Sequence, residues 1–170
     1  NPALERKLDT GLHSVVFSVI VLLYSWYILV GDIKDSLPLY HCRLSMILLC
    51  VIYVLRRFGS LKFQGLIEQW TVTMAMEGAW MAVIMPTPDK FGFPHITNYT
   101  YFVGHFALLA IALFYISNWQ KKPGFSDFLR LLLIMLAYNV FLFVFDLIFK
   151  ENYGFFVDVP GFEWLFEKMP

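Results

Sequence analysis

The sequence has few charged residues, few cysteines and neither an internal repeat nor a low-complexity segment. Asp, Glu, Lys and Arg account for 15% of the 170 residues, whereas hydrophobic residues account for 59%. A soluble globular domain carries about 25% charged residues, so this chain is too apolar to cover itself with a water-facing surface. The two cysteines do not make a disulfide framework. These scarcities argue against a soluble domain and against a fold held by disulfides.

The charged residues that are present balance, with 13 basic and 13 acidic side chains. No basic face with interleaved aromatic residues is found, so we expect no nucleic-acid partner. Aromatic residues make up 19% of the chain, and in such a sequence they suit lipid-facing and interfacial positions. The mean hydropathy of +0.63 agrees with a membrane environment.

Five apolar segments are long enough to cross a bilayer as helices. A spanning helix needs about 20 apolar residues for a hydrocarbon core of roughly 30 Å. The segments comprise residues 12–30, 38–55, 66–85, 99–117 and 128–149, separated by short loops rich in Gly and Pro. A soluble protein with a large buried helical core is the alternative, but it would need amphipathic outer helices to face water. The sequence therefore predicts an all-α fold, a polytopic transmembrane bundle of about five spans forming one domain over residues 1–170.

The C-terminal segment, residues 150–170, is too short to span and is interrupted by Gly154, Pro160 and Gly161. Its Phe and Trp residues are favoured at the boundary between membrane and water. We expect this segment to form an interfacial tail.

The basic residues predict an orientation. Flanks on one side of the predicted spans hold eight of them, namely Arg6, Lys7, Arg56, Arg57, Lys62, Lys121, Lys122 and Arg130. Flanks on the other side hold four, namely Lys34, Lys90, Lys150 and Lys168. Cytoplasmic loops carry the excess of Lys and Arg, so we predict a multi-pass protein of the cell membrane with a cytoplasmic N-terminus.

Polar residues within the predicted spans gather at similar depths in the outer half of the bilayer. At about 1.5 Å per residue, Asp146 lies roughly 5 Å from the outer end of its span, Cys42 about 6 to 8 Å, His105 about 9 Å, Glu77 about 12 Å and Asn139 about 15 Å. Ionisable groups inside a membrane are costly and usually face a bundle interior or a cavity. We therefore predict a functional site where these residues converge.

Ordinary structural roles compete with this interpretation. Asn139 can equally be a hydrogen-bonding contact between helices, and Asp146 is expected to reach the outer headgroup region. Glu77 is followed by Gly78 and Ala79, so we expect it to be buried against a partner helix and either protonated or paired with His or Arg.

Other polar residues are expected to lie outside the site. Glu68, near the cytoplasmic end of its span, is expected to extend toward water. His13 and His95 lie near opposite interfaces and are expected to be solvated. Cys50 is expected to be a buried hydrophobic residue.

Cys42 and His105 have a context that suits nucleophilic chemistry. The sequence Ser-Leu-Pro at residues 36–38 predicts a helix start with Pro38 at the first position, which places Cys42 just past the first turn. The positive end of the helix dipole and the adjacent Arg43 favour a thiolate, whereas burial opposes it, so a base is required. His105 can supply that base if the second and fourth spans are neighbours.

Two residues beside Cys42 are further candidates. His41 is a competing base, but adjacent residues on a helix point about 100° apart, so it is poorly aimed at the sulfur. Arg43 lies near the outer surface and is suited to holding a lipid phosphate.

Several short motifs together resemble a known family. They are "LPLYHCRLSM", "MEGAWMAVIMP", "YFVGHFALL", "YNVF" and "ENYGFF", spread over about residues 37–156. The chain resembles the bacterial YwaF-type integral membrane proteins, which are themselves similar to a eukaryotic family of multi-pass ether-phospholipid acyltransferases. The resemblance implies that the cysteine and histidine of that family correspond to Cys42 and His105.

The leading hypothesis is a membrane-embedded, thiol-dependent acyltransferase or lipid hydrolase that acts on phospholipid acyl esters without a cofactor. Cys42 would attack the ester and His105 would transfer the proton, with Glu77 or Asn139 orienting the imidazole. Arg43 and His41 would bind the phosphate or stabilise the oxyanion. Membrane lipids are the partners that this hypothesis requires.

Three alternatives belong to other classes. The pocket could bind or transport a small solute or a lipid without catalysis, or the protein could be a membrane subunit that docks a partner through its aromatic tail. A metal site is the third, because zinc accepts ligands of the types found at His41, His105, Glu77 and Asp146. Single ligands on four helices lack a pair at helical spacing, so we expect no metal.

Overall fold

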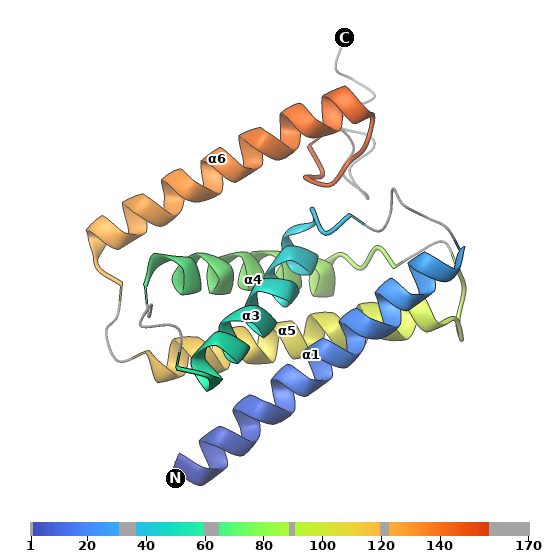
Figure 1. Cartoon of the computed structure of the whole chain (residues 1–170). Coiled ribbons are helices and arrows are strands. Elements are labelled where there is room, and N and C mark those ends of the chain that lie inside the picture. The colour runs from blue at the N-terminus through green and yellow to red at the C-terminus, as the bar shows by residue number, and fades with distance from the viewer. Residues whose placement is uncertain (1, 31–36, 60–64, 89–90, 120–122, 157–170) are drawn as a thin grey trace.

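The computed structural model describes residues 2–30, 37–59, 65–88, 91–119 and 123–156, and the described residues form five α-helices and no strand (Figure 1). The helices are α1 (Pro2–Val30), α3 (His41–Arg57), α4 (Leu66–Ile84), α5 (Ile96–Asn118) and α6 (Phe125–Phe149). The prediction of an all-α helical bundle is confirmed. Of the predicted tail, residues 157–170 lie outside the described residues, as do residues 31–36 of the predicted first loop.

Three helices, α1, α5 and α6, are long and apolar enough to cross a membrane. The other two fall short of the five predicted spans. α3 has 17 residues, and α4 carries Glu68, Gln69 and Glu77 among its 19. α3 packs against α1 and α4, and α4 packs against α3, α5 and α6. Glu68 of α4 thereby finds a protein partner, Arg56 of α3, instead of lipid.

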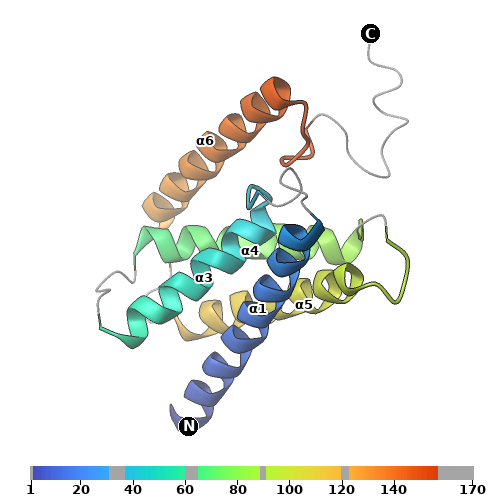
Figure 2. The same ribbon diagram turned by 45° about the vertical axis from the view of Figure 1, so that its right-hand side comes forward.

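α4 lies at the centre of the arrangement and contacts α3, α5 and α6. α1 packs against α5 and α3, while α6 packs against α4 and lies apart from α1 in both ribbon views (Figures 1 and 2). Small side chains on the facing surfaces, including Ala75 and Ala79 of α4 and Ala107 and Ala112 of α5, are fully or almost fully buried. Small residues let helix backbones approach closely, which favours packing in a membrane.

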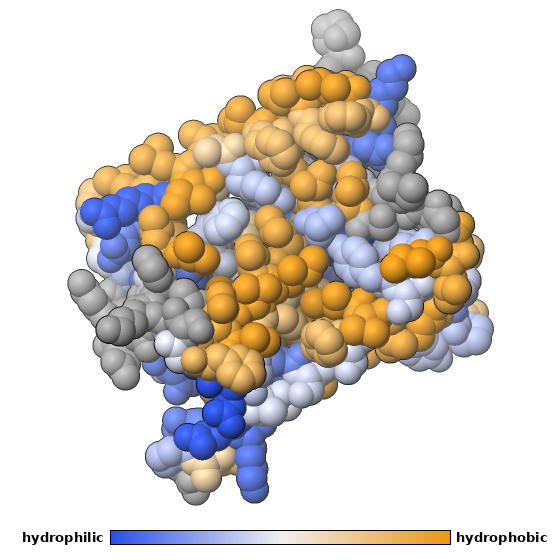
Figure 3. Space-filling view, viewed as in Figure 1, coloured by the Kyte–Doolittle hydropathy of each residue, from blue (hydrophilic) through white to orange (hydrophobic). Residues whose placement is uncertain are grey.

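Large apolar side chains cover the outside of the molecule. Leu133 and Ile148 of α6 are 65% and 67% exposed, and Leu29 of α1 is 81% exposed. Figure 3 shows apolar side chains along α6, with hydrophilic residues gathered at the N-terminal end of α1. A surface of this kind is unfavourable in water and suits contact with lipid.

α3 begins later than predicted. Residues 37–40 form a turn, and Leu44 N donates to the carbonyl of Tyr40, which precedes the first helical residue, His41. Pro38 therefore lies in the turn, where its fixed φ is also favourable. The prediction that Pro38 opens the helix is wrong, and Cys42 lies within the first turn.

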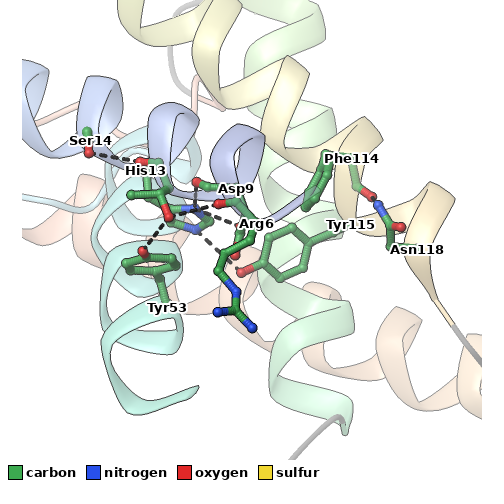
Figure 4. A network of polar contacts seen from close by, with 9 residues as sticks. Arg6, Asp9, His13, Ser14, Tyr53, Phe114, Tyr115 and Asn118 are labelled. Atoms are coloured by element: carbon green, nitrogen blue, oxygen red, sulfur yellow. Dashed lines mark hydrogen bonds and ion pairs between the residues drawn. The ribbon is translucent and has the colours of Figure 1, made fainter. Parts of the chain in front are cut away.

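A buried polar network joins the helices at the end where α1 begins (Figure 4). His13 is 3% exposed, its Nδ1 donates to the Asp9 carbonyl at 2.8 Å, and its ring stacks on Tyr53 at 4.4 Å. The hydroxyl of Tyr115 lies 3.4 Å from Nε2 of the same imidazole. The prediction of a solvated His13 is wrong, because side chains from α3 and α5 enclose it.

Glu68 and His95 also differ from their predictions. Glu68 is 4% exposed, forms an ion pair with Arg56 and accepts a hydrogen bond from Trp119 Nε1 at 3.2 Å. It does not extend toward water, because Arg56 compensates its charge inside the bundle. His95 is half-buried and caps α5 by accepting from Thr97 N.

Candidate functional site

A cavity of about 490 Å³ lies at the start of α3 and is lined by residues from all five helices and from the turn after α6. Six candidate residues contribute to its lining, namely His41, Cys42, Arg43, Glu77, His105 and Asn139, whereas Asp146, which lies at a similar predicted depth, does not. Apolar walls come from Leu23, Met46, Met81, Met85, Phe155 and Phe156. A cavity of this size with a few polar groups on apolar walls is typical of a ligand site.

Cys42 is held in place by a close contact between α3 and α4. A Cβ atom added at Gly78 would lie 2.9 Å from the backbone nitrogen of Cys42 and 3.2 Å from its Cβ. Only glycine at position 78 leaves room for this approach. Because Cys42 lies in the first turn, its amide belongs to the group of N–H donors that have no intrahelical acceptor. The positive end of the α3 dipole is therefore at the cavity.

His105 is oriented by its own helix. The side chain is 6% exposed, and Nδ1 donates to the carbonyl of Tyr101 at 2.6 Å. The two rings lie 4.3 Å apart. A carbonyl only accepts, so the proton of the neutral imidazole lies on Nδ1 and Nε2 has a free lone pair. α3 and α5 are in contact, which is the neighbour relation that the sequence argument required.

Asn139 forms the predicted hydrogen bond between helices but does not orient His105, and Glu77 differs from its prediction. Asn139 Oδ1 accepts from Nε2 of His41 at 2.8 Å, so the side chain that it orients is His41, whereas the Tyr101 carbonyl orients His105. Glu77 is exposed and faces the cavity, contrary to the expected burial against a helix, because Gly78 makes the helix contact.

The residue before Asn139 strengthens the contact between α6 and the start of α3. Tyr138 donates its hydroxyl proton to the Leu39 carbonyl at 2.7 Å, and its ring lies edge-on to His41 at 5.2 Å. The motif "YNVF" thus contributes two of the polar contacts that hold α6 beside the candidate nucleophile.

Arg43 is enclosed by aromatic rings at the cavity wall. Its Nη2 donates to the hydroxyl of Tyr27 at 2.6 Å, and the guanidinium lies 5.0 Å from the Tyr27 ring centre and 4.9 Å from that of Tyr40. Cation–π contacts and the hydrogen bond fix a delocalised positive charge beside Cys42. A planar guanidinium held in this way can bind an oxyanion or a phosphate.

Asp146 is 1% exposed, so its carboxylate is enclosed by protein instead of extending toward the headgroup region as predicted. Its two carboxylate oxygens accept from the backbone nitrogens of Tyr153 and Gly154, each at 2.9 Å. Sequence reasoning missed this role, although an acidic residue in the last turn of a helix opposes the helix dipole and signals a specific partner. Within the described residues, no three His, Cys, Asp or Glu side chains are arranged to hold a metal ion.

Comparison with known proteins identifies a family. The model of the TMEM164 family matches residues 3–170. No curated protein and no solved structure matches the chain. The match covers almost the whole sequence, including every residue that lines the cavity. The chain therefore belongs to the TMEM164 family, a family of membrane proteins.

Proposed function

We propose that the protein is a thiol-dependent acyltransferase or lipid hydrolase that acts on phospholipid acyl esters. The observation that carries the proposal is that Cys42 and His105, on two contacting helices, line the same cavity. A nucleophile and a base at one apolar site are what acyl transfer requires. The resemblance to YwaF-type proteins and to ether-phospholipid acyltransferases points to the same chemistry.

In the proposed reaction, Nε2 of His105 takes the proton of the Cys42 thiol and the sulfur attacks the ester carbonyl. A C–S bond forms, the ester C–O bond breaks, and the departing alcohol oxygen takes the proton from His105. The products of this half are a lysophospholipid and a thioester on Cys42. An acceptor hydroxyl, from a second lipid in transfer or from water in hydrolysis, then attacks the thioester and gives its proton to His105. The imidazole returns that proton to the sulfur.

Two groups are suited to the negative charge of this reaction. The amide of Cys42, in the first turn of α3, can donate to the oxyanion that forms at the carbonyl. The guanidinium of Arg43 is held by Tyr27 and Tyr40 and can bind the phosphate of the same lipid. His41, whose Nε2–H donates to Asn139, would be a second donor for that phosphate in its protonated form, through Nδ1.

The proposed setting is the bacterial cell membrane, with the N-terminus in the cytoplasm and the cavity in the outer half of the bilayer. The excess of Lys and Arg on the flanks at the opposite end of the predicted spans from the cavity supports this orientation. A lipid in the outer leaflet would then reach Cys42 without crossing the bilayer.

The experiment uses labelled phospholipid and the purified protein in lipid nanodiscs. Cys42→Ser should abolish transfer while the fold persists, because a hydroxyl is similar in size but far harder to ionise. His105→Ala should lose comparable activity, and the double variant should be little worse than either single one. Cys50→Ser removes the other thiol and serves as the matched control, with activity retained.

A labelled acyl-enzyme that neutral hydroxylamine releases is the expected intermediate. The proposal fails if Cys42→Ser keeps full activity. Loss of lipid binding in Arg43→Ala or Glu77→Ala, with no dependence on Cys42, would instead assign the cavity to lipid or solute binding or transport.

A further inference from the structure

The segment after α6 turns back toward the start of α3 (Figures 1 and 2). We call residues 151–156 the closing turn. α6 ends where Lys150 adopts the left-handed conformation, with φ 56° and ψ 45°, and Phe155 has a φ of 55°. The backbone nitrogens of Lys150 and Glu151 both donate to the carbonyl of Asp146. These conformations reverse the chain within a few residues.

The carboxylate of Asp146 holds the closing turn. Each of its oxygens accepts one backbone N–H, from Tyr153 and from Gly154, at 2.9 Å. Asp146 and Tyr153 are 1% and 2% exposed. Hydrogen bonds to a buried carboxylate are stronger than neutral ones, and losing them leaves buried N–H groups without acceptors.

The closing turn forms one wall of the cavity. Gly154, Phe155 and Phe156 line it. The rings of Tyr153 and Phe155 lie 5.0 and 5.6 Å from the ring of Tyr40.

Tyr40 connects this wall to the candidate nucleophile. Its ring lies 4.9 Å from the guanidinium of Arg43, and it immediately precedes α3, two residues before Cys42. A displacement of the closing turn would therefore both open the cavity and remove the aromatic support of the α3 start.

We propose that Asp146 is a positioning residue that holds the closing turn over Cys42, so that Phe155 and Phe156 limit the bulk of the group that reaches the thiol. That the closing turn limits the size of the acyl chain rests on the proposed function. That it limits the access of any reagent to the Cys42 thiol does not. In this proposal the motif "ENYGFF" forms the wall that limits access to Cys42.

The test measures alkylation of Cys42 in a Cys50→Ala background, with a small maleimide and with a bulky one. Asp146→Asn keeps the size of the side chain but loses the charge and one of its two acceptors. The bulky reagent should then react about tenfold faster, in line with the loss of one strong hydrogen bond, while the small reagent changes little. Asp127→Asn is the matched control, because Asp127 also accepts a backbone N–H on α6, from Gly124, but at the opposite end. It should leave both rates unchanged.

Phe155→Ala gives a second reading that leaves the carboxylate in place. This variant should also increase the rate at which the bulky maleimide alkylates Cys42, because it removes one ring of the cavity wall and leaves the hydrogen bonds of Asp146 intact. If the bulky reagent reacts equally fast with Asp146→Asn and Asp127→Asn, the positioning role is refuted. Should Asp146→Asn fail to fold, an unchanged bulky-reagent rate in Phe155→Ala overturns the proposal.

Acyl transfer gives an independent reading. In Asp146→Asn, the ratio of kcat/KM for a short-chain over a long or branched acyl donor should fall about tenfold, on the same basis. An unchanged ratio would count against the proposal. If the wild-type protein transfers no acyl group, the proposed function fails, but the maleimide rates still decide whether Asp146 holds the wall.

Discussion

Gly78 is the position where a single methyl group would test the close packing at the candidate nucleophile. In Gly78→Ala the new Cβ would lie 2.9 Å from the Cys42 nitrogen and 3.3 Å from its Cα. Non-bonded heavy atoms pack best at a separation of about 3.5 to 4.0 Å. The Cys42 nitrogen, and α3 with it, must therefore move away from the new Cβ by roughly 0.6 Å or more. The contact atoms are backbone, which no side-chain rotation can relieve.

The energetic effect has two opposing parts. Overpacking in a well-packed interior costs about 1 to 3 kcal/mol. Alanine in a helix interior recovers about 1 kcal/mol relative to glycine. We therefore expect a net loss of about 0 to 2 kcal/mol in the free energy of unfolding. The effect on chemistry should be larger, because a misplacement of about 1 Å can cost roughly a hundredfold in rate, so transfer should fall about tenfold.

The assay combines the melting temperature in nanodiscs with the rate of acyl transfer to or from labelled phospholipid. Gly11→Ala is the control, since a Cβ there meets nothing within 4 Å and alanine should stabilise α1. If both variants are stabilised and transfer at equal rates, then the close contact of α3 with α4 does not position Cys42.

Two further predictions concern the bundle as a whole. Arg56→Ala should destabilise the protein by about 2 to 3 kcal/mol, because it leaves Glu68, which is 4% exposed, without its charged partner. This is less than the roughly 3 to 5 kcal/mol expected for a fully buried pair, because Arg56 is 33% exposed. Thermal unfolding measures the loss, and an effect no larger than that of Arg57→Ala, at the exposed neighbouring position, would contradict the prediction. For the orientation, an impermeant thiol reagent on intact cells should label Ser36→Cys but not Ser60→Cys, because the positive-inside rule places residue 60 in the cytoplasm; the reverse result would invert the topology.

The sequence by itself determined where most of the helices run. Four of the five predicted segments match α1, α4, α5 and α6 at their C-terminal ends to within a residue, because a long apolar run bounded by Gly and Pro leaves few other structures in a membrane. The starts were less well predicted. α1 begins at Pro2 instead of residue 12, and α3 begins at His41 instead of Pro38, since Pro38 fits the first position of a helix and a turn equally well. Local propensity could not choose between those two.

The composition of the cavity was also accessible from the sequence. Depth along each span, counted at about 1.5 Å per residue, grouped Asp146, Cys42, Glu77, His105 and Asn139. The structure places the last four around one cavity, whereas Asp146 binds the closing turn instead of lining the cavity. Depth is a one-dimensional quantity that helices in a bilayer share, so it can be compared between segments before their packing is known.

Only the tertiary structure decided which polar groups meet. Asn139 bonds His41 rather than His105, Glu68 pairs with Arg56, and Asp146 binds the backbone of the closing turn. The first two contacts depend on the rotation of one helix about its axis relative to another, and the third depends on how the chain turns back after α6. The hydrophobic pattern does not fix that rotation when a helix is apolar on all sides. It is fixed instead by close contacts such as that of Gly78 with Cys42, where the absence of one side chain sets the distance and orientation of two helices.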